Sequence, residues 1–203
     1  MQSSMPMLSN TDQRVVRAYG DAIGTIFLSL FGLAWILLAL ASLGQLHAYL
    51  VVLLSCFVAI LLASSISVLR RTHLLVREQK KSPHGKHINR MFGLVNVIQW
   101  TVIFLAVDLL GHFHLGHWIV PTIIMIVGIH FLPLAYLFQA RLHYVTGCAL
   151  VLWAVAAPLL VPSYAMEAIA ALGTGAILWL TAVKQTMGSL RLSRGLHPTM
   201  ATK

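Results

Sequence analysis

Residues 22–43 read AIGTIFLSLFGLAWILLALASL, an uncharged and largely apolar stretch. A helix of about 20 apolar residues spans the hydrocarbon core of a bilayer, which is about 30 Å thick. Five similar stretches follow, near residues 49–69, 91–111, 119–138, 144–162 and 165–184. The chain is 59% hydrophobic and 9% charged, whereas soluble domains carry about 25% charged residues. The sequence therefore predicts an all-α polytopic membrane protein, in which residues 1–203 form a single membrane domain, a compact bundle of six transmembrane helices.

The basic residues indicate how this bundle is oriented. All 14 Lys and Arg residues lie at or beyond the ends of the six stretches, and seven of them fall within residues 70–90. The connections at 44–48, 112–118 and 163–164 contain no Lys or Arg. Because cytoplasmic loops collect positive charge, we expect both termini in the cytoplasm and a cytoplasmic basic loop at 70–90.

This orientation also accounts for the formal net charge of +9. We therefore expect the lipid bilayer, and not nucleic acid, to be the main partner of the chain. The 70–90 loop is placed to contact anionic lipid headgroups, where each basic residue contributes about 1 kcal/mol near the surface. The alternative is a solvated loop that only sets the topology. A homodimer is a further option, since two copies would enclose a path across the membrane more easily than one.

Ionisable residues within membrane spans usually face the bundle interior and often carry function. Asp108 lies near the outer end of the third stretch. At about 100° per residue, Thr101, Asp108 and His112 share one face of that helix, and His112 is one turn beyond Asp108. The functional interpretation is a proton-binding or metal-orienting pair, which would lie on a transport path. The alternative is a helix end whose polar residues face external water.

The connection after the third stretch supplies three imidazoles within six residues, His112, His114 and His117. Neutral imidazole is a common ligand for zinc, copper and nickel. The segment is therefore a candidate site for a divalent metal, the one cofactor that the sequence suggests. A proton-responsive cluster and a plain interfacial loop are the alternatives.

His130 lies near the middle of the fourth stretch, three residues before Pro133. Proline has no N–H to donate to the carbonyl of Ile129, so the sequence predicts a kink and a free carbonyl beside a midplane imidazole. Transporter sites often use interrupted helices in this way. The alternative is a neutral core histidine that is hydrogen-bonded to a neighbouring helix.

The sixth stretch carries a polar stripe in which Glu167, Thr174, Thr181 and Gln185 follow one another at spacings of seven, seven and four residues. Residues seven apart share a helix face. For the threonines, close helix packing through small and hydroxyl side chains is the preferred interpretation. Glu167 lies within a turn of the outer interface, where it could act as a gate or simply favour the start of the helix.

The segment Gly128-Ile129-His130-Phe131-Leu132-Pro133-Leu134-Ala135 resembles a stretch found in a family of small bacterial six-helix integral membrane proteins. The resemblance implies a location in the bacterial inner membrane and draws attention to His130 and Pro133. It brings no activity with it.

These patterns lead to three functional hypotheses. The first is a small transporter or channel-like protein for a small solute, proton or cation, with His130, Asp108, His112 and Glu167 along its path. The second is a sensory or structural accessory membrane protein. The third is an intramembrane enzyme that uses a histidine-bound metal; no motif of a known protease or phosphatase supports it, and a non-enzyme is the favoured prediction.

Overall fold

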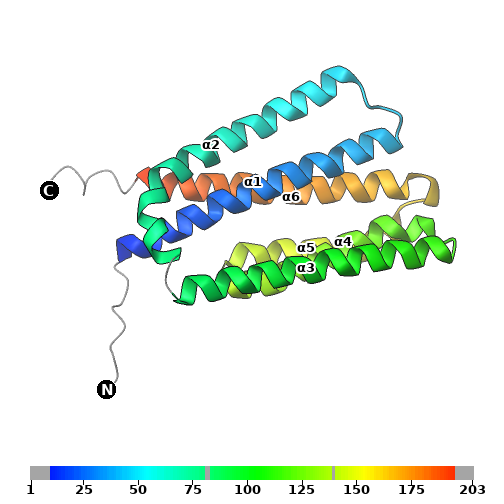
Figure 1. The fold of residues 1–203 in the computed structure, drawn as a ribbon. Coiled ribbons are helices and arrows are strands. Elements are labelled where there is room, and N and C mark those ends of the chain that lie inside the picture. Colours follow the sequence, from blue (N-terminus) through cyan, green and yellow to red (C-terminus); the bar gives the residue numbers. More distant parts are fainter. Residues whose placement is uncertain (1–9, 81–82, 139, 195–203) are drawn as a thin grey trace, which may run out of the picture.

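The computed structural model describes residues 10–80, 83–138 and 140–194, which form six long helices and one 3₁₀ turn (Figure 1). These are α1 (Asn10–Ser42), α2 (Ala48–Lys80), α3 (Pro83–His112), η1 (Gly116–Trp118), α4 (Ile119–Phe138), α5 (Arg141–Leu160) and α6 (Ser163–Arg194). Each long helix contains a stretch of 20 to 30 residues that is long and apolar enough to cross a membrane. The prediction of an all-α, six-helix membrane protein is confirmed.

The segment at 70–90 differs from the predicted loop. Helix α2 continues to Lys80 and α3 begins at Pro83, so most of this segment is helical. Leu, Arg, Glu, Gln and Lys all favour helix, and they dominate residues 70–80. At 33 residues, α2 is about 50 Å long and extends well beyond a hydrocarbon core of about 30 Å.

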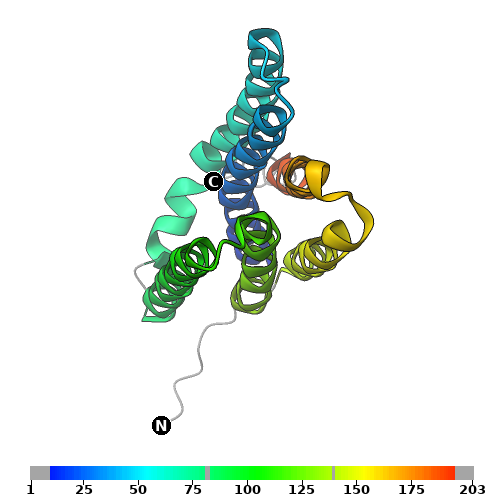
Figure 2. The same ribbon diagram turned by 90° about the vertical axis from the view of Figure 1, so that its right-hand side faces the viewer.

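The helices form two units of three (Figures 1 and 2). In the first unit, α1 packs most extensively against α6, and α2 lies against both. In the second unit, α4 packs against α5, and α3 lies against α4. The two units meet mainly where α5 faces α6. Neighbouring helices in each unit therefore need not be neighbours in the sequence.

Helices α1 and α6 approach closely because small residues lie between them. A side chain at Gly32 would collide with the indole ring of Trp179, and a Cβ at Gly175 would lie 3.0 Å from the carbonyl oxygen of Gly32. The Trp179 indole N–H donates a hydrogen bond to the carbonyl oxygen of Ser29, at 3.1 Å. Helix packing in membranes relies on such close approach, because burial from lipid supplies little hydrophobic driving force.

Helices α4 and α5 cross at a pair of glycines. A Cβ at Gly147 would lie 2.8 Å from the carbonyl oxygen of Gly128, and a Cβ at Gly128 would lie 3.1 Å from the carbonyl oxygen of Gly147. Each glycine therefore leaves room for the backbone of the other helix. This crossing sets how closely α4 and α5 approach each other.

The even number of spans brings both ends of the described chain to one side of the bundle (Figure 1). We name this side, where α1 begins and α6 finishes, the basic end. The opposite side consists of the connections 43–47, 113–118 and 161–162, and we name it the histidine end. A core contributed by five helices fills the space between the two units, and it includes Leu28, Trp35, Leu61, Ile124, Leu150 and Leu178.

Candidate functional site

A cavity of about 310 Å³ opens at the histidine end, between the beginning of α4 and the beginning of α6. Its walls include Gly116, His117 and Val120 on one side and Ser163, Tyr164 and Glu167 on the other. The first group belongs to the unit formed by α3, α4 and α5, and the second belongs to the unit formed by α1, α2 and α6. The cavity therefore lies at the boundary between the two units.

Local structure explains why an acidic side chain is stable here. Glu167 is the fifth residue of α6, just beyond the first helical turn. Ser42, the last residue of α1, donates a hydrogen bond from Oγ to Glu167 Oε1 at 3.1 Å. The carboxylate is thus anchored by two helices while it remains exposed to the cavity.

His117, also at the histidine end, contributes an imidazole side chain to the same cavity. It lies in η1, the single 3₁₀ turn that leads into α4, and its ring contacts that of Trp118. Together, His117 and Glu167 present an imidazole and a carboxylate to one hollow. No Lys or Arg occurs in residues 43–47, 113–118 or 161–162, so the fixed charge at this end favours cations.

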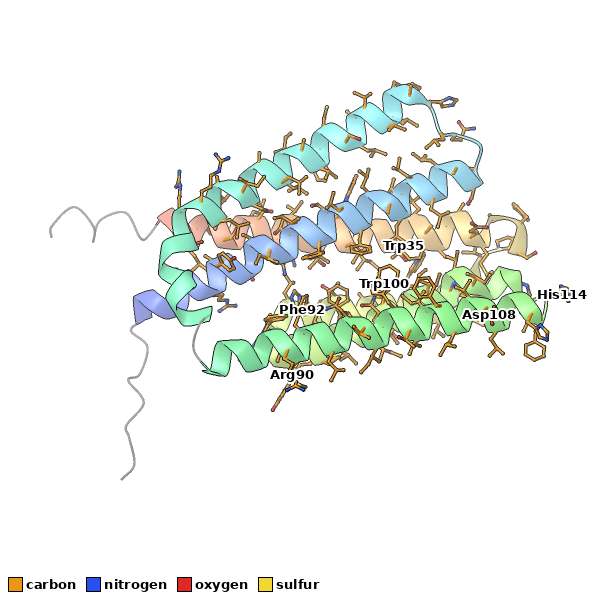
Figure 3. The ribbon with its side chains drawn as sticks, in the orientation of Figure 1. Trp35, Arg90, Phe92, Trp100, Asp108 and His114 are labelled. Carbon is orange, nitrogen blue, oxygen red and sulfur yellow. The ribbon has the colours of Figure 1, made fainter. Side chains whose placement is uncertain are left out.

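The three histidines proposed as a metal site do not converge. His112, His114 and His117 are all exposed, and His114 adopts a left-handed backbone conformation with φ of 57°. Its side chain projects from the end of the bundle (Figure 3). Within the described part of the chain, no group of three or more His, Cys, Asp or Glu side chains is placed to hold a metal ion. Metal binding stays a prediction from the sequence.

Asp108 and His112 are also separate from the cavity. Both side chains are exposed, and neither lines the hollow that contains Glu167. Among the described residues, they form no hydrogen bond or ion pair with each other. The shared face that their spacing predicts points away from the rest of the bundle, since Ile103 is the buried residue of this span.

His130 is half-buried on α4, and α4 continues through Pro133 to Phe138. The neighbouring Phe131 ring lies edge-on to the His143 ring on α5, with centroids 5.6 Å apart. His130 itself forms no hydrogen bond to a described residue. The cavity at Glu167 does not extend to His130. The four residues predicted to line a path therefore do not share one cavity.

The polar stripe of α6 does face the interior. Thr174, Thr181 and Gln185 are all buried, with Gln185 only 3% exposed. Both threonines donate hydrogen bonds to carbonyls of their own helix, Thr174 to Ala170 and Thr181 to Ile177. The hydroxyls are therefore satisfied within α6, in agreement with a packing role.

A second polar group lies nearer the basic end, where α5 meets α6. The hydroxyls of Thr146 and Thr181 share a hydrogen bond of 2.9 Å, and Gln185 Nε2 lies 3.5 Å from His143 Nδ1. Gln185 Oε1 faces Gly24 of α1 and is the one buried side-chain oxygen or nitrogen without a partner in the described residues. An unpaired buried acceptor costs free energy, so this site is poised to accept a hydrogen bond.

The sequence contained part of this second group. The spacing of seven and then four residues placed Gln185 on the same face of α6 as Thr174 and Thr181. Spacing within one helix carries no information about which neighbouring helix lies opposite, so the approach of His143 was not predicted. The same reason explains why His117 and Glu167 were assigned separate roles.

The predicted contact of the 70–90 segment with anionic lipid falls largely on side chains outside the described residues. Of the basic residues there, Arg70, Arg71 and Arg90 are described, and all three are exposed. Figure 3 shows Arg90 directed away from the other helices, on the opposite side of α3 from Phe92.

A second hollow of about 340 Å³ lies on the surface between α4 and α5, with Trp118, Met125, Val155 and Leu159 among its lining residues. Its walls are almost entirely apolar, and Trp118, Val155 and Leu159 are exposed. A surface of this kind at membrane depth suits lipid acyl chains.

With this geometry established, the chain was compared with known proteins. No family model, curated protein or solved structure matches it. The architecture establishes a six-helix, multi-pass membrane protein, and any more specific function must be argued from the residues at the two polar groups.

Proposed function

We propose that the protein is a small membrane transporter for cations, with its outer entrance at the cavity between α4 and α6. The observation that carries this proposal is the position of that cavity. It holds the Glu167 carboxylate and lies at the boundary between two three-helix units. Transporters commonly bind their substrates between two helical units that rock against each other.

The line of polar side chains along α6 supports a path through the same boundary. From Glu167, the line continues through Thr174 and Thr181 to Gln185. At the far end, the unpaired Gln185 Oε1 supplies an acceptor oxygen, and His143 lies beside it. Carbonyl and carboxylate oxygens are suitable ligands for hard cations.

In this state the path is closed in the middle. Ile124, Leu150 and Leu178 are buried between the two polar groups and belong to the main core. The predicted orientation, with the basic end in the cytoplasm of a bacterial cell, makes this an inward-closed and outward-facing form. Transport then requires α6 to separate from α5, across the contacts of Thr146 with Thr181 and of His143 with Gln185.

The test is cation flux into liposomes that contain the purified protein. Glu167→Gln removes the negative charge from the cavity and should reduce flux about tenfold to a hundredfold, because hydrogen bonds to charged groups contribute about 1.5–3 kcal/mol. His117→Ala, in the cavity wall, should also reduce flux. His114→Ala is the matched control, since this exposed histidine does not line the cavity, and flux should be unchanged.

Equal flux in the Glu167→Gln and wild-type proteins contradicts the proposed entrance. Equal losses in His117→Ala and His114→Ala contradict it as well, because they would indicate a general effect of the histidine end. Each variant is compared at equal amounts of folded protein in the liposomes, judged by size-exclusion chromatography.

A sensory or accessory role is the second candidate, and one observation favours it. The α6 hydroxyls are already bonded to their own helix, and the core closes the route between the two polar groups. A packed bundle of this kind can serve as a scaffold whose exposed histidines respond to acid. Wild-type protein that gives no flux above empty liposomes, for any cation tested, would favour this role over transport.

A further inference from the structure

Helix α3 is the least buried of the six spans. Only 6% of its most apolar 18-residue stretch is buried, compared with 22–50% in the other five spans. Of the side chains in Arg90–His112, Ile103 alone is buried. Helix α3 packs mainly against α4, with smaller contacts to α2 and η1.

The exposed side of α3 carries a regular seam. Successive members are separated by four, three, four, three and four residues, which is the spacing of a coiled-coil interface. The members are Leu94, Ile98, Thr101, Leu105, Asp108 and His112, and every one is exposed. At about 100° per residue, this α3 seam is centred opposite Ile103 and therefore opposite α4.

Exposed leucine and isoleucine need no explanation in a membrane, because lipid tails are as apolar as these side chains. The polar members of the seam do require one. Asp108 lies within the apolar span, one turn before His112, and its carboxylate faces away from its own bundle. Acidic residues in membrane spans usually face protein or a water-filled cavity, where they find a hydrogen-bond partner.

We propose that the α3 seam is the interface of a homodimer, in which α3 packs in parallel against α3 of a second copy. All copies share one orientation in the membrane, so a twofold axis along the membrane normal brings identical residues together at the same depth. Asp108 therefore lies opposite the partner's Asp108, and the knobs-into-holes packing of a coiled coil also brings each Asp108 against the partner's His112, one turn away. The seam thereby supplies both the carboxylate acceptor and the imidazole donor for two equivalent hydrogen bonds.

The charge on this surface favours a second copy over lipid. A carboxylate and an imidazole one turn apart are complementary to the same pair on an identical helix. Lipid tails offer no donor to Asp108. The inference concerns assembly and does not depend on transport, because the cavity at Glu167 lies between α4 and α6 within one chain.

Cysteine cross-linking tests the seam directly. The two native cysteines, Cys56 and Cys148, are both exposed, and they are first replaced by alanine. Leu94→Cys and Leu105→Cys place single thiols on the seam. Val102→Cys and Phe104→Cys are the matched controls: both positions are exposed, lie at the depth of Leu105, and point about 80° to either side of the seam.

Mild oxidation in native membranes should give a disulfide-linked dimer with the two seam variants and little or none with Val102→Cys and Phe104→Cys. Asp108→Leu, added to Leu105→Cys, should lower the dimer association constant about threefold to tenfold, as expected for loss of hydrogen bonds between membrane helices. Circular dichroism and retention on size-exclusion chromatography check that the variant is folded.

Three outcomes would overturn the proposal. A seam that faces lipid, or a different protein, gives no self-cross-linked dimer at Leu94→Cys or Leu105→Cys. Equal cross-linking at all four positions indicates random collision. Undiminished cross-linking after Asp108→Leu contradicts the proposed contribution of Asp108 and His112 to the interface. Loss of flux in the Glu167→Gln protein is independent of all three, so the two proposals fail separately.

Discussion

The glycine crossing of α4 and α5 leads to a quantitative prediction about stability. In Gly147→Ala, the new Cβ would lie 2.8 Å from the carbonyl oxygen of Gly128 and 3.0 Å from Phe131 Cβ. The first contact is about 0.6 Å short of the 3.4 Å at which ordinary van der Waals contact begins. A backbone carbonyl in the middle of a helix cannot rotate away as a side chain can, so the two helices must separate.

Overpacking of this kind costs about 1–3 kcal/mol. Alanine also favours helix over glycine by about 1 kcal/mol, which would mask part of the loss. Gly93→Ala in α3 is the matched control, because a Cβ there meets nothing within 4 Å. Both variants gain the same helix propensity, so the difference between them reports the crossing alone.

Thermal unfolding in detergent measures this difference. For a chain of this size, each kcal/mol shifts Tm by about 2–4 °C, so Gly147→Ala should unfold roughly 2–12 °C below Gly93→Ala. The double variant Gly128→Ala/Gly147→Ala should lose less than the sum of the two single variants, since both disturb one contact. Equal Tm values for Gly147→Ala and Gly93→Ala would show that close approach at the glycine crossing does not limit the stability of the bundle.

Two further predictions concern the boundary between the units and the orientation of the bundle. The Trp153 indole N–H donates a hydrogen bond to the Ala170 carbonyl at 2.9 Å. Trp153→Phe should therefore lower the free energy of unfolding by about 0.5–1.5 kcal/mol, measured by the same thermal assay. An unchanged Tm would show that this bond adds nothing to the contact of α5 with α6. In a cysteine-free background, a membrane-impermeant thiol reagent applied to intact cells should label His114→Cys and not Arg191→Cys, because basic residues collect in the cytoplasm. The reverse labelling pattern would invert the assignment of the two ends.

Residue spacing within one helix predicts which side chains share a face, but not whether that face points into the bundle or away from it. The sequence placed Asp108 and His112 on a common face of α3, and the structure agrees that both are exposed on one side. The sequence did not reveal that this face points away from the bundle, because α3 carries polar residues on both sides, with Asn96 and Gln99 opposite Asp108 and His112. The expectation that Asp108 lines an internal path is therefore not supported by its position.

The amino-acid sequence was sufficient to predict the class of the protein and the number of its spans. An apolar stretch of about 20 residues has one stable solution in lipid, because each backbone N–H and C=O must be satisfied within its own helix. The polar stripe on α6 could also be predicted from the sequence, because residues seven apart share a face in any helix.

Which helices pack against each other is defined by the tertiary structure and could not be predicted from the sequence. The tertiary structure brought α6 against α1, paired Gly128 with Gly147, and placed His117 beside Glu167 in one cavity. Lipid is nearly as favourable a neighbour for an apolar helix as another helix is, so hydropathy does not rank the alternatives. The ranking comes from shape, that is, from where small residues allow two backbones to meet, and this depends on three-dimensional fit between distant segments.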